Sequence, residues 1–224
     1  MSQRIVFLID SFAGPWAGTE RQLWYLLEGI DRDRFEPHLI LLRHSRFSQS
    51  AKSWPCPVDV VGVGSLASLD GLRGFARLVR LVRSLDGRVV HAFFPDSSLL
   101  GPLAARLAGA RFVAGRRDMG IWYTPTNLRL LRLIGRLVDR VIANSNAVRE
   151  LVAVEEGISK SRISVIYNGL EQEQGVEYDA NGLDDRVPKA APVIGIVANL
   201  RPVKRHADLI SAFARVRQDV PAAH

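Results

Sequence analysis

The residues with the clearest chemical potential lie near the end of the chain, in a loop that carries Asn199, Arg201 and Lys204. The loop follows an apolar run at residues 193–197 and precedes an amphipathic helix that we expect at about residues 205–218. The first turn of a helix offers backbone N–H groups and partial positive charge, and Arg or Lys adds a full charge. The loop therefore favours an anionic ligand, although a basic surface loop between two elements would look the same.

A second candidate region follows the first predicted strand, where Gly14 and Gly18 lie ahead of a helix that begins at Thr19. Glycine has no Cβ, so a ligand can approach the backbone closely at such a turn. Ligands of doubly wound sheets bind at the carboxyl ends of the strands, which favours phosphate or sugar binding here. The Gly-x-Gly-x-x-Gly spacing of dinucleotide sites is absent, and a turn that simply needs glycine is the alternative.

Charged residues also follow a later strand, predicted at residues 111–114, in the order Arg116, Arg117 and Asp118. The planar guanidinium group matches carboxylate or phosphate. We expect both arginines to face the same crevice as the first glycine loop, whereas an Arg–Asp pair that only fixes the loop is the alternative. His91 ends another strand, and a lone histidine there is more often a partly buried structural side chain than a base.

Composition narrows the classes of function. The 224 residues include 30 Lys and Arg against 23 Asp and Glu, a formal net charge of +7, which favours anionic partners. The arginines are spread along helices, so we expect no nucleic-acid partner. Cys56 is the single cysteine, which excludes an intramolecular disulfide and a multi-cysteine metal site. No apolar run approaches the length of a membrane span, and we expect a cytoplasmic protein.

Short apolar runs alternate with helix-length segments along the chain. We expect strands at residues 4–10, 35–42, 58–63, 89–92, 111–114, 140–143, 163–166 and 193–197. Helices are expected at residues 19–28, 72–85, 127–138, 146–156 and 205–218, and another from a cap at Asp96 or Ser97 to Leu107. This alternation predicts an α/β fold, a Rossmann-like doubly wound parallel sheet with helices on both faces.

The pattern lapses at residues 171–191, which are polar, acidic and rich in helix and strand breakers. We interpret them as a linker between a Rossmann-like domain at residues 1–170 and a second unit at residues 192–224. The second unit holds one strand and one helix, which cannot bury their apolar faces alone. We therefore expect an incomplete Rossmann-like unit that packs on the first domain, dimerises or frays.

Arginine recurs at helical spacing in two helices. One carries Arg73, Arg77, Arg80 and Arg83, and the other, or its end, carries Arg129, Arg132, Arg136 and Arg140. In the second helix, the core-facing stripe is predicted to consist of Leu130, Leu131, Ile134, Leu137 and Val138. Cationic helix faces can bind anionic lipid, but we favour a solvated face in which arginine serves as a good helix former.

Four segments in order resemble the family-4 glycosyltransferases of GT-B fold. They are AGTERQL at 17–23, VIANSNAVR at 141–149, ISVIYNGL at 163–170 and IVANLRPVKRH at 196–206. The resemblance implies an acceptor-side domain followed by the start of a donor-binding domain. The implied reaction transfers a sugar from a nucleotide-sugar with retention of configuration, without a cofactor or an obligatory metal. Glycolipid, polysaccharide or cell-envelope glycan synthesis is the implied setting.

The resemblance also assigns residues. Gly18 and Lys204 would bind the donor phosphates, and the lysine charge would offset the charge that builds on the leaving group. The family usually has Arg where this chain has Asn199, so Arg201 is expected to supply that cation. The acceptor-side cleft would include Gly14, Arg116, Arg117, Asp118, Asn168 and Gly169. Many members have His in place of Arg117, and the acceptor chemistry would differ accordingly.

The family's two donor-binding glutamates, eight residues apart, would fall beyond His224. We therefore expect a truncated enzyme that is inactive alone. Its expected partners are a nucleotide-sugar, a glycan or lipid-linked acceptor and, peripherally, an anionic membrane. The first alternative is a non-catalytic acceptor- or lipid-phosphate-binding module. The second is a nucleotide-sugar epimerase, against which the missing dinucleotide fingerprint and the missing Tyr-x-x-x-Lys argue.

Overall fold

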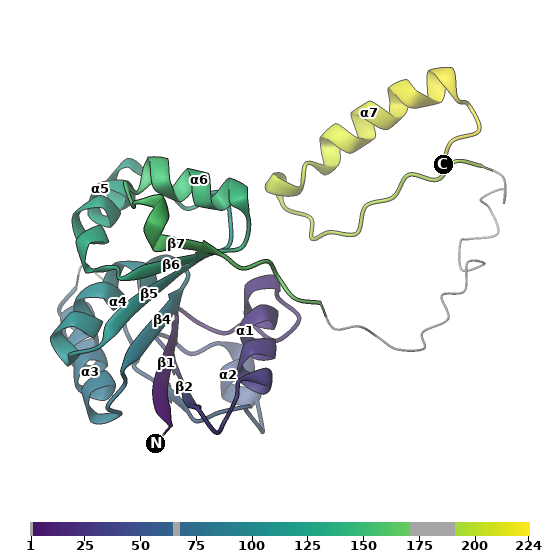
Figure 1. Cartoon of the computed structure of the whole chain (residues 1–224). Coiled ribbons are helices and arrows are strands. Elements are labelled where there is room, and N and C mark those ends of the chain that lie inside the picture. The colour runs from purple at the N-terminus through teal and green to yellow at the C-terminus, as the bar shows by residue number, and fades with distance from the viewer. Residues whose placement is uncertain (1, 65–67, 171–190) are drawn as a thin grey trace. The chain divides into compact units, whose positions relative to one another are not determined.

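The computed structural model describes residues 2–64, 68–170 and 191–224 (Figure 1). It divides into two compact units, Met1–Leu170 and Glu171–His224. We describe each unit by itself. The predicted linker at residues 171–191 lies outside the described residues except for its last position.

Strands and helices alternate along the first unit, and the first element is a strand. The strands are β1 (Gln3–Ile9), β2 (Phe35–Leu41), β3 (Val58–Val60), β4 (Val89–Phe93), β5 (Arg111–Arg116), β6 (Arg140–Ala143) and β7 (Ile163–Val165). The helices are α1 (Gly18–Gly29), α2 (Arg46–Ser50), α3 (Leu69–Ser84), α4 (Pro95–Ala108), α5 (Pro125–Ile134) and α6 (Asn146–Glu155), with 3-10 helices η1 (Gly135–Leu137) and η2 (Lys160–Arg162).

All seven strands form one parallel sheet in the order β3-β2-β1-β4-β5-β6-β7. The predicted doubly wound sheet is confirmed. The chain starts at β1 in the middle, builds outward to β3, then crosses back to β4 and continues to β7 (Figure 1). The strand order reverses between β1 and β4, and such a switch point opens a crevice at the carboxyl ends of the strands.

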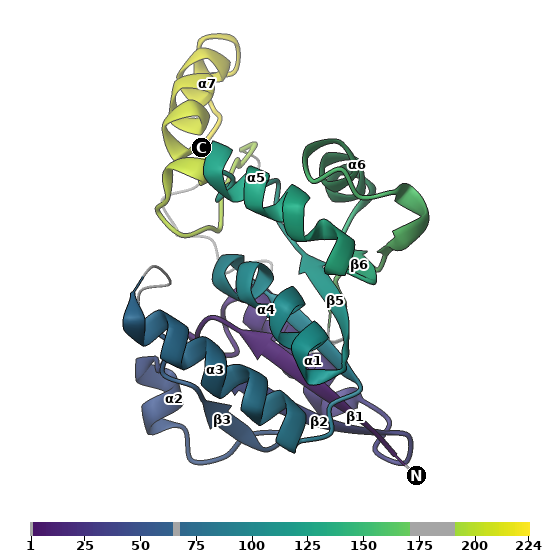
Figure 2. The same ribbon diagram turned by 90° about the vertical axis from the view of Figure 1, so that its left-hand side faces the viewer.

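Each face of the sheet has its own core, which explains why the strands are apolar at successive positions. Val6 and Leu8 of β1 belong to a core shared with α3, α4 and α6. Phe7 and Ile9 point to the opposite face and pack with residues of α1 and α2. In Figure 2, α3 and α4 lie side by side over the face turned toward the viewer. Neither face of β1 is left to solvent, which fixes this strand at the centre.

Helix α4 begins differently from the prediction that Asp96 or Ser97 caps it. The residue at its cap is Phe94, whose φ of 70° lies in the left-handed region and whose side chain makes no capping hydrogen bond. The carboxylate of Asp10, at the end of β1, instead accepts hydrogen bonds from the amides of Asp96 (3.1 Å) and Ser97 (2.7 Å). Burial raises the pKa of Asp10, and this effect exceeds that of the hydrogen bonds from Ser97, which lower the pKa. The cap therefore comes from a residue about ninety positions earlier, which local sequence cannot indicate.

The second unit contains η3 (Pro202–Lys204) and α7 (His206–Asp219). The strand predicted at residues 193–197 is wrong: the segment has no strand pairing, and Val197 is fully exposed. Two backbone hydrogen bonds hold its start, from Ile194 to His224 (2.8 Å) and from His224 to Pro192 (2.9 Å). A strand needs a neighbour that satisfies its N–H and C=O groups, and the described residues of this unit supply none beyond these two hydrogen bonds.

We predict that Asp10→Ala lowers the free energy of unfolding by about 2–3 kcal/mol, because two partly buried amides of the first turn of α4 lose a charged acceptor. Urea denaturation followed by tryptophan fluorescence measures the change. Asp96→Ala is the control, since it removes only a partly exposed ion pair with Arg43 at 2.6 Å and is expected to cost less than about 1 kcal/mol. Equal losses in the two variants would contradict the capping role of Asp10.

Candidate functional site

The carboxyl edge of the sheet gathers polar residues from segments far apart in the sequence. Gln22 of α1 forms two hydrogen bonds with the backbone of Gly169, from its Nε2 to the carbonyl oxygen (2.8 Å) and from the Gly169 amide to its Oε1 (2.9 Å). Next to Gly169, the side chain of Asn168 accepts a hydrogen bond from Nη1 of Arg117 at 2.7 Å. The exits of β5 and β7 are therefore tied together and to α1.

Arg117 has hydrogen-bonding capacity that the protein leaves unused. Its guanidinium carbon lies 5.5 Å from the ring centre of Phe93, and burial lowers its pKa. Its Nε is buried without a hydrogen-bond partner in the described part of the chain. Asn144, just after β6, donates to the carbonyl of Arg117 at 3.1 Å, while its own Oδ1 is equally buried and unpartnered. A donor and an acceptor thus remain for a water molecule or a ligand.

Asn144 was not singled out from the sequence, although a signal was present. It is a polar residue directly after a predicted apolar strand, at the same edge as Arg117. Its importance depends on which backbone carbonyl it contacts, and only the packing of β6 beside β5 decides that.

Arg116 takes a different role from that of Arg117. It is the last residue of β5, which extends two positions beyond the predicted end, and its side chain is buried. Its Nε and Nη2 donate to the two oxygens of Glu156 at 2.6 and 2.9 Å, and its Nη1 donates to Ser98 at 2.9 Å. The Tyr123 hydroxyl also donates to Glu156. The Arg–Asp pair that was the alternative does not form: Arg116 pairs with Glu156, and Asp118 has no ion-pair partner among the described residues.

Asp118 shapes the loop that follows β5. Its Oδ1 accepts hydrogen bonds from the amides of Gly120 (2.7 Å) and Ile121 (3.3 Å). Gly120 has a φ of 70°, and a Cβ there would lie 2.6 Å from the ring of Tyr123. Only glycine fits this turn. The loop is therefore held by the Asp118 carboxylate at one end and by Tyr123 on Glu156 at the other.

A small cavity borders both arginines. Its volume is about 20 Å³, enough for roughly one water molecule. The lining residues are Thr19, Phe93, Phe94, Ser98, Gly115, Arg116, Arg117, Asp118 and Trp122. Gly18 does not line it, but its neighbour Thr19 does, so the first helix and the end of β5 meet at one edge as expected.

The two glycines of the first loop differ in their surroundings. Gly14 has a φ of 144°, and a Cβ there would lie 2.3 Å from the indole of Trp16, so this turn requires glycine for a structural reason. Around Gly18 nothing lies within 4 Å of where a Cβ would be, which leaves room for a ligand. Ala17 at the cap of α1 provides no capping side chain. No capping side chain at Ala17 therefore competes with an anion at Gly18, while the buried Glu20 carboxylate accepts a hydrogen bond from its own amide in the same turn.

The remaining candidates lie in the second unit. Asn199 and Arg201 precede η3, and Lys204 ends it, two residues before α7 begins. All three are exposed. Arg205, in the left-handed conformation, joins η3 to α7, and its guanidinium pairs with Asp208. Two cations thus precede a 14-residue helix with no capping side chain. The donor-phosphate candidates are divided between the two units.

His91 is a structural residue, as favoured from the sequence. It lies within β4, buried, with its ring centre 4.4 Å from that of Phe93. Burial, with the charge of Arg117, lowers the pKa of His91 to about 3. The ring is therefore neutral at physiological pH. Its Nε2 has no hydrogen-bond partner in the described part of the chain.

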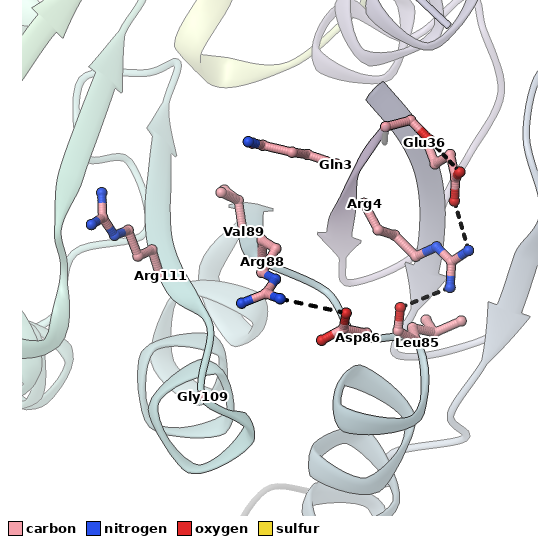
Figure 3. A pocket seen from close by; sticks show the side chains of 10 residues that line it. Gln3, Arg4, Glu36, Leu85, Asp86, Arg88, Val89, Gly109 and Arg111 are labelled. Atoms are coloured by element: carbon pink, nitrogen blue, oxygen red, sulfur yellow. Dashed lines mark hydrogen bonds and ion pairs between the residues drawn. The ribbon is translucent and has the colours of Figure 1, made fainter. Parts of the chain in front are cut away.

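A more spacious depression lies elsewhere, at the amino ends of β1, β4 and β5 (Figure 3), with a volume of about 780 Å³. Most of its charged groups already bind each other: Arg4 pairs with Glu36 at 2.6 Å and donates to the carbonyl of Leu85 at 2.8 Å, and Arg88 lies 3.8 Å from Asp86. Helix crossovers end rather than begin at this edge, so it lacks open helix N-termini. We assign the functional site to the carboxyl edge.

The sequence from residue 16 to residue 174 matches the model of Glycosyltransferase Family 4. The chain belongs to this family. The resemblance inferred from the four sequence segments is thereby confirmed, and the fold is that of the GT-B glycosyltransferases. No curated protein sequence matches it significantly.

Solved structures of glycosyltransferases share the fold. The Anabaena protein HepE, in complex with UDP, is similar over 95% of this chain, with 25% sequence identity and a TM-score of 0.73. A glycosyltransferase from Rickettsia africae is similar over 97%, with 16% identity and a TM-score of 0.71. The chain spans 58% and 59% of the lengths of these two proteins.

Two further observations concern cofactors and membranes. In the described residues, no three His, Cys, Asp or Glu side chains gather into a group that could hold a metal ion. Within the same residues, no helix is both long and apolar enough to cross a bilayer.

We predict that Glu156→Gln lowers the free energy of unfolding by about 3–5 kcal/mol, because it leaves the buried charge of Arg116 without a counter-charge. Chemical denaturation of purified variants measures the effect. Glu155→Gln is a matched control one residue away: Glu155 is partly exposed and lies 3.8 Å from Arg132, so its loss is expected to cost less than about 1 kcal/mol. Similar losses in both variants would show that the Arg116 pair does not stabilise this edge.

Proposed function

We propose that this glycosyltransferase uses a nucleotide-sugar donor and transfers the sugar, with retention of configuration, to a glycan or lipid-linked acceptor in the cytoplasm. Cell-envelope glycan or polysaccharide synthesis is the proposed setting. The observation that carries the donor assignment is the similarity to HepE over 95% of the chain, since structures of HepE hold UDP and UDP-glucose. The chain spans 58% of the length of HepE. The glycosyl transfer reaction of the whole protein is therefore proposed.

The carboxyl edge of the first unit suits the acceptor. Arg117 and Asn144 offer a buried donor and a buried acceptor without partners among the described residues. A sugar hydroxyl can both donate and accept a hydrogen bond, so it can satisfy such a pair. The Arg117 charge would also favour a phosphate near the acceptor, as in lipid-linked sugars. The ties from Arg117 to Asn168 and from Gln22 to Gly169 would hold these groups in place.

On the family resemblance, the donor diphosphate would bind Gly18 at the start of α1 and the cations Arg201 and Lys204. As the glycosidic bond to the donor breaks, negative charge builds on the leaving diphosphate. A fixed Lys204 ammonium would stabilise that charge more in the transition state than in the ground state, which accelerates the reaction. Arg201 would take the place of the arginine that the family usually has at position 199. Retention and independence of a metal are proposed on the family resemblance.

The test is an assay of the protein, as its host cell makes it, against a panel of UDP- and GDP-sugars with lipid-linked and free glycan acceptors. Release of nucleoside diphosphate reports turnover, and the anomeric proton signals of the product report stereochemistry. We expect release with one class of donor and a product with the donor's anomeric configuration. An inverted product would exclude retention, and binding of acceptor without release from any donor would favour the non-catalytic module.

We predict that Lys204→Ala in the same protein reduces kcat by about 10²–10³-fold, because removing one such charge stabiliser raises the barrier by about 3–4 kcal/mol. Lys204 is exposed, so the free energy of unfolding should change by no more than about 0.5 kcal/mol. Arg215→Ala, which removes an exposed cation from α7, is the matched control and should leave kcat unchanged. Full activity of Lys204→Ala, or a large fall in its melting temperature, would contradict the assignment.

A further inference from the structure

Helix α5 has apolar side chains on two sides, which differs from the sequence-based expectation. Leu131 is buried, as predicted for the core-facing stripe. Leu130, assigned to the same stripe, is 43% exposed, and Leu133 is 73% exposed. The placement of Leu130 was wrong because residues 130 and 131 are separated by about 100° around a helix. Leu130 and Leu133, three positions apart, share an outward face.

The outward face of α5 is flanked by positive charge alone. Arg129, four positions before Leu133, lies on the same side. The sequence from Met119 to Val138 contains three arginines and no Asp or Glu. Arg132 donates to the carbonyl of Glu155 at 2.7 Å. Arg129 and Arg136 are exposed and have no hydrogen-bond or ion-pair partner among the described residues.

The loop before α5 also exposes large apolar side chains. Met119 and Ile121 are 56% and 68% exposed. The loop does not vary freely, since Asp118 and Gly120 fix its turn. The chain therefore holds two large apolar side chains in solvent immediately beyond Arg117.

Helix α3 shows that arginines at similar spacing can serve another purpose. Its arginines bind within the chain: Arg73 pairs with Asp70 at 3.2 Å, Arg77 donates to the carbonyl of Gly62 at 2.8 Å, and Arg83 donates to the carbonyl of Leu107 at 2.5 Å. α3 thus agrees with the interpretation favoured from the sequence, in which the arginines do not bind lipid. α5 does not fit it, because its free arginines accompany an unpartnered apolar stripe.

We propose that the outer face of α5, with Arg129, Leu130 and Leu133, docks on an anionic membrane surface together with Arg136 of η1 and the preceding loop residues Met119 and Ile121. Apolar side chains of an interfacial helix enter the boundary between headgroups and acyl chains, while arginines pair with anionic headgroups. The absence of acidic residues between Met119 and Val138 makes the charge of this face complementary to such a surface. Figure 2 shows α5 at the periphery of the first unit, beside α4.

Docking in this way would have a consequence for the acceptor. The chain passes directly from Arg117 and Asp118 into the loop of Met119 and Ile121, so the acceptor-side edge would face the lipid surface. A lipid-linked acceptor could then reach Arg117 without leaving the membrane. The docking itself needs neither donor nor turnover, so it is tested separately from the proposed reaction.

The test is co-sedimentation of the 224-residue chain with vesicles of phosphatidylcholine alone and of phosphatidylcholine mixed in equal parts with phosphatidylglycerol. We expect binding to the anionic vesicles only, weakening as salt is added, because headgroup attraction is screened. Two double variants, Leu130→Ser with Leu133→Ser and Arg129→Gln with Arg136→Gln, should each lower the partition coefficient by about tenfold or more. Circular dichroism checks that each variant is folded.

Matched controls come from α3, where Leu69→Ser with Leu72→Ser and Arg73→Gln with Arg80→Gln should leave vesicle binding unchanged. Equal binding to both vesicle types, or binding to anionic vesicles that the α5 variants do not weaken, would overturn the proposal. A self-associated form in sedimentation velocity that the Leu130 and Leu133 variant dissolves, without vesicle binding by the parent chain, would also overturn it. That result would assign the face to a second copy of the chain.

Discussion

Every strand of the first unit runs in the same direction, and this constraint organises the rest of the molecule. A parallel strand must be followed by a crossover, so the chain leaves each strand at the same edge of the sheet. Residues that are up to 147 positions apart, such as Gln22 and Gly169, can then form two hydrogen bonds with each other. The same constraint buries β1 on both faces and places the reversal of strand order beside it.

The carboxyl edge contains several buried or half-buried polar and charged groups, and they fall into two sets, with and without hydrogen-bond partners. Arg116 is neutralised in a buried pair with Glu156, to which Tyr123 also donates. Asp10 is used to satisfy the amides at the start of α4. Arg117 and Asn144 retain unsatisfied atoms. A fixed framework of satisfied polar groups thus surrounds a few unsatisfied ones, an arrangement that suits ligand binding because the binding groups are already positioned.

The two arginine-rich helices show that residue spacing alone does not decide whether an arginine binds within the chain. The arginines of α3 reach carbonyls at the ends of neighbouring segments, since α3 packs between α4 and the residues after β3. α5 lies at the periphery, where Arg129 and Arg136 find no such carbonyl in the described part of the chain. The same residue type is thus structural on one helix and available to a partner on the other.

Much of the fold could be predicted from the sequence because it depends on local properties. Continuous apolar runs such as residues 4–10 require burial on both faces. Because they alternate with amphipathic segments that can cover both faces, they predict a doubly wound parallel sheet. The clustering of Arg116, Arg117, Asn168 and Gly169 at one edge also follows, because each comes after a strand predicted from the sequence. Short α2 was missed, since its five residues are set by the Ser45–Ser48 capping box rather than by periodicity.

Only the tertiary structure decided what each of these residues does. Sequence cannot distinguish Arg116 from Arg117, because the choice depends on Glu156, forty positions away, lying opposite one of them. Nor can it place the cap of α4 on Asp10, or Leu130 outside the core. The apolar run at residues 193–197 shows this limit of sequence-based prediction most simply. Its composition favours a strand, but a strand forms only where a neighbouring strand can accept and donate its backbone hydrogen bonds.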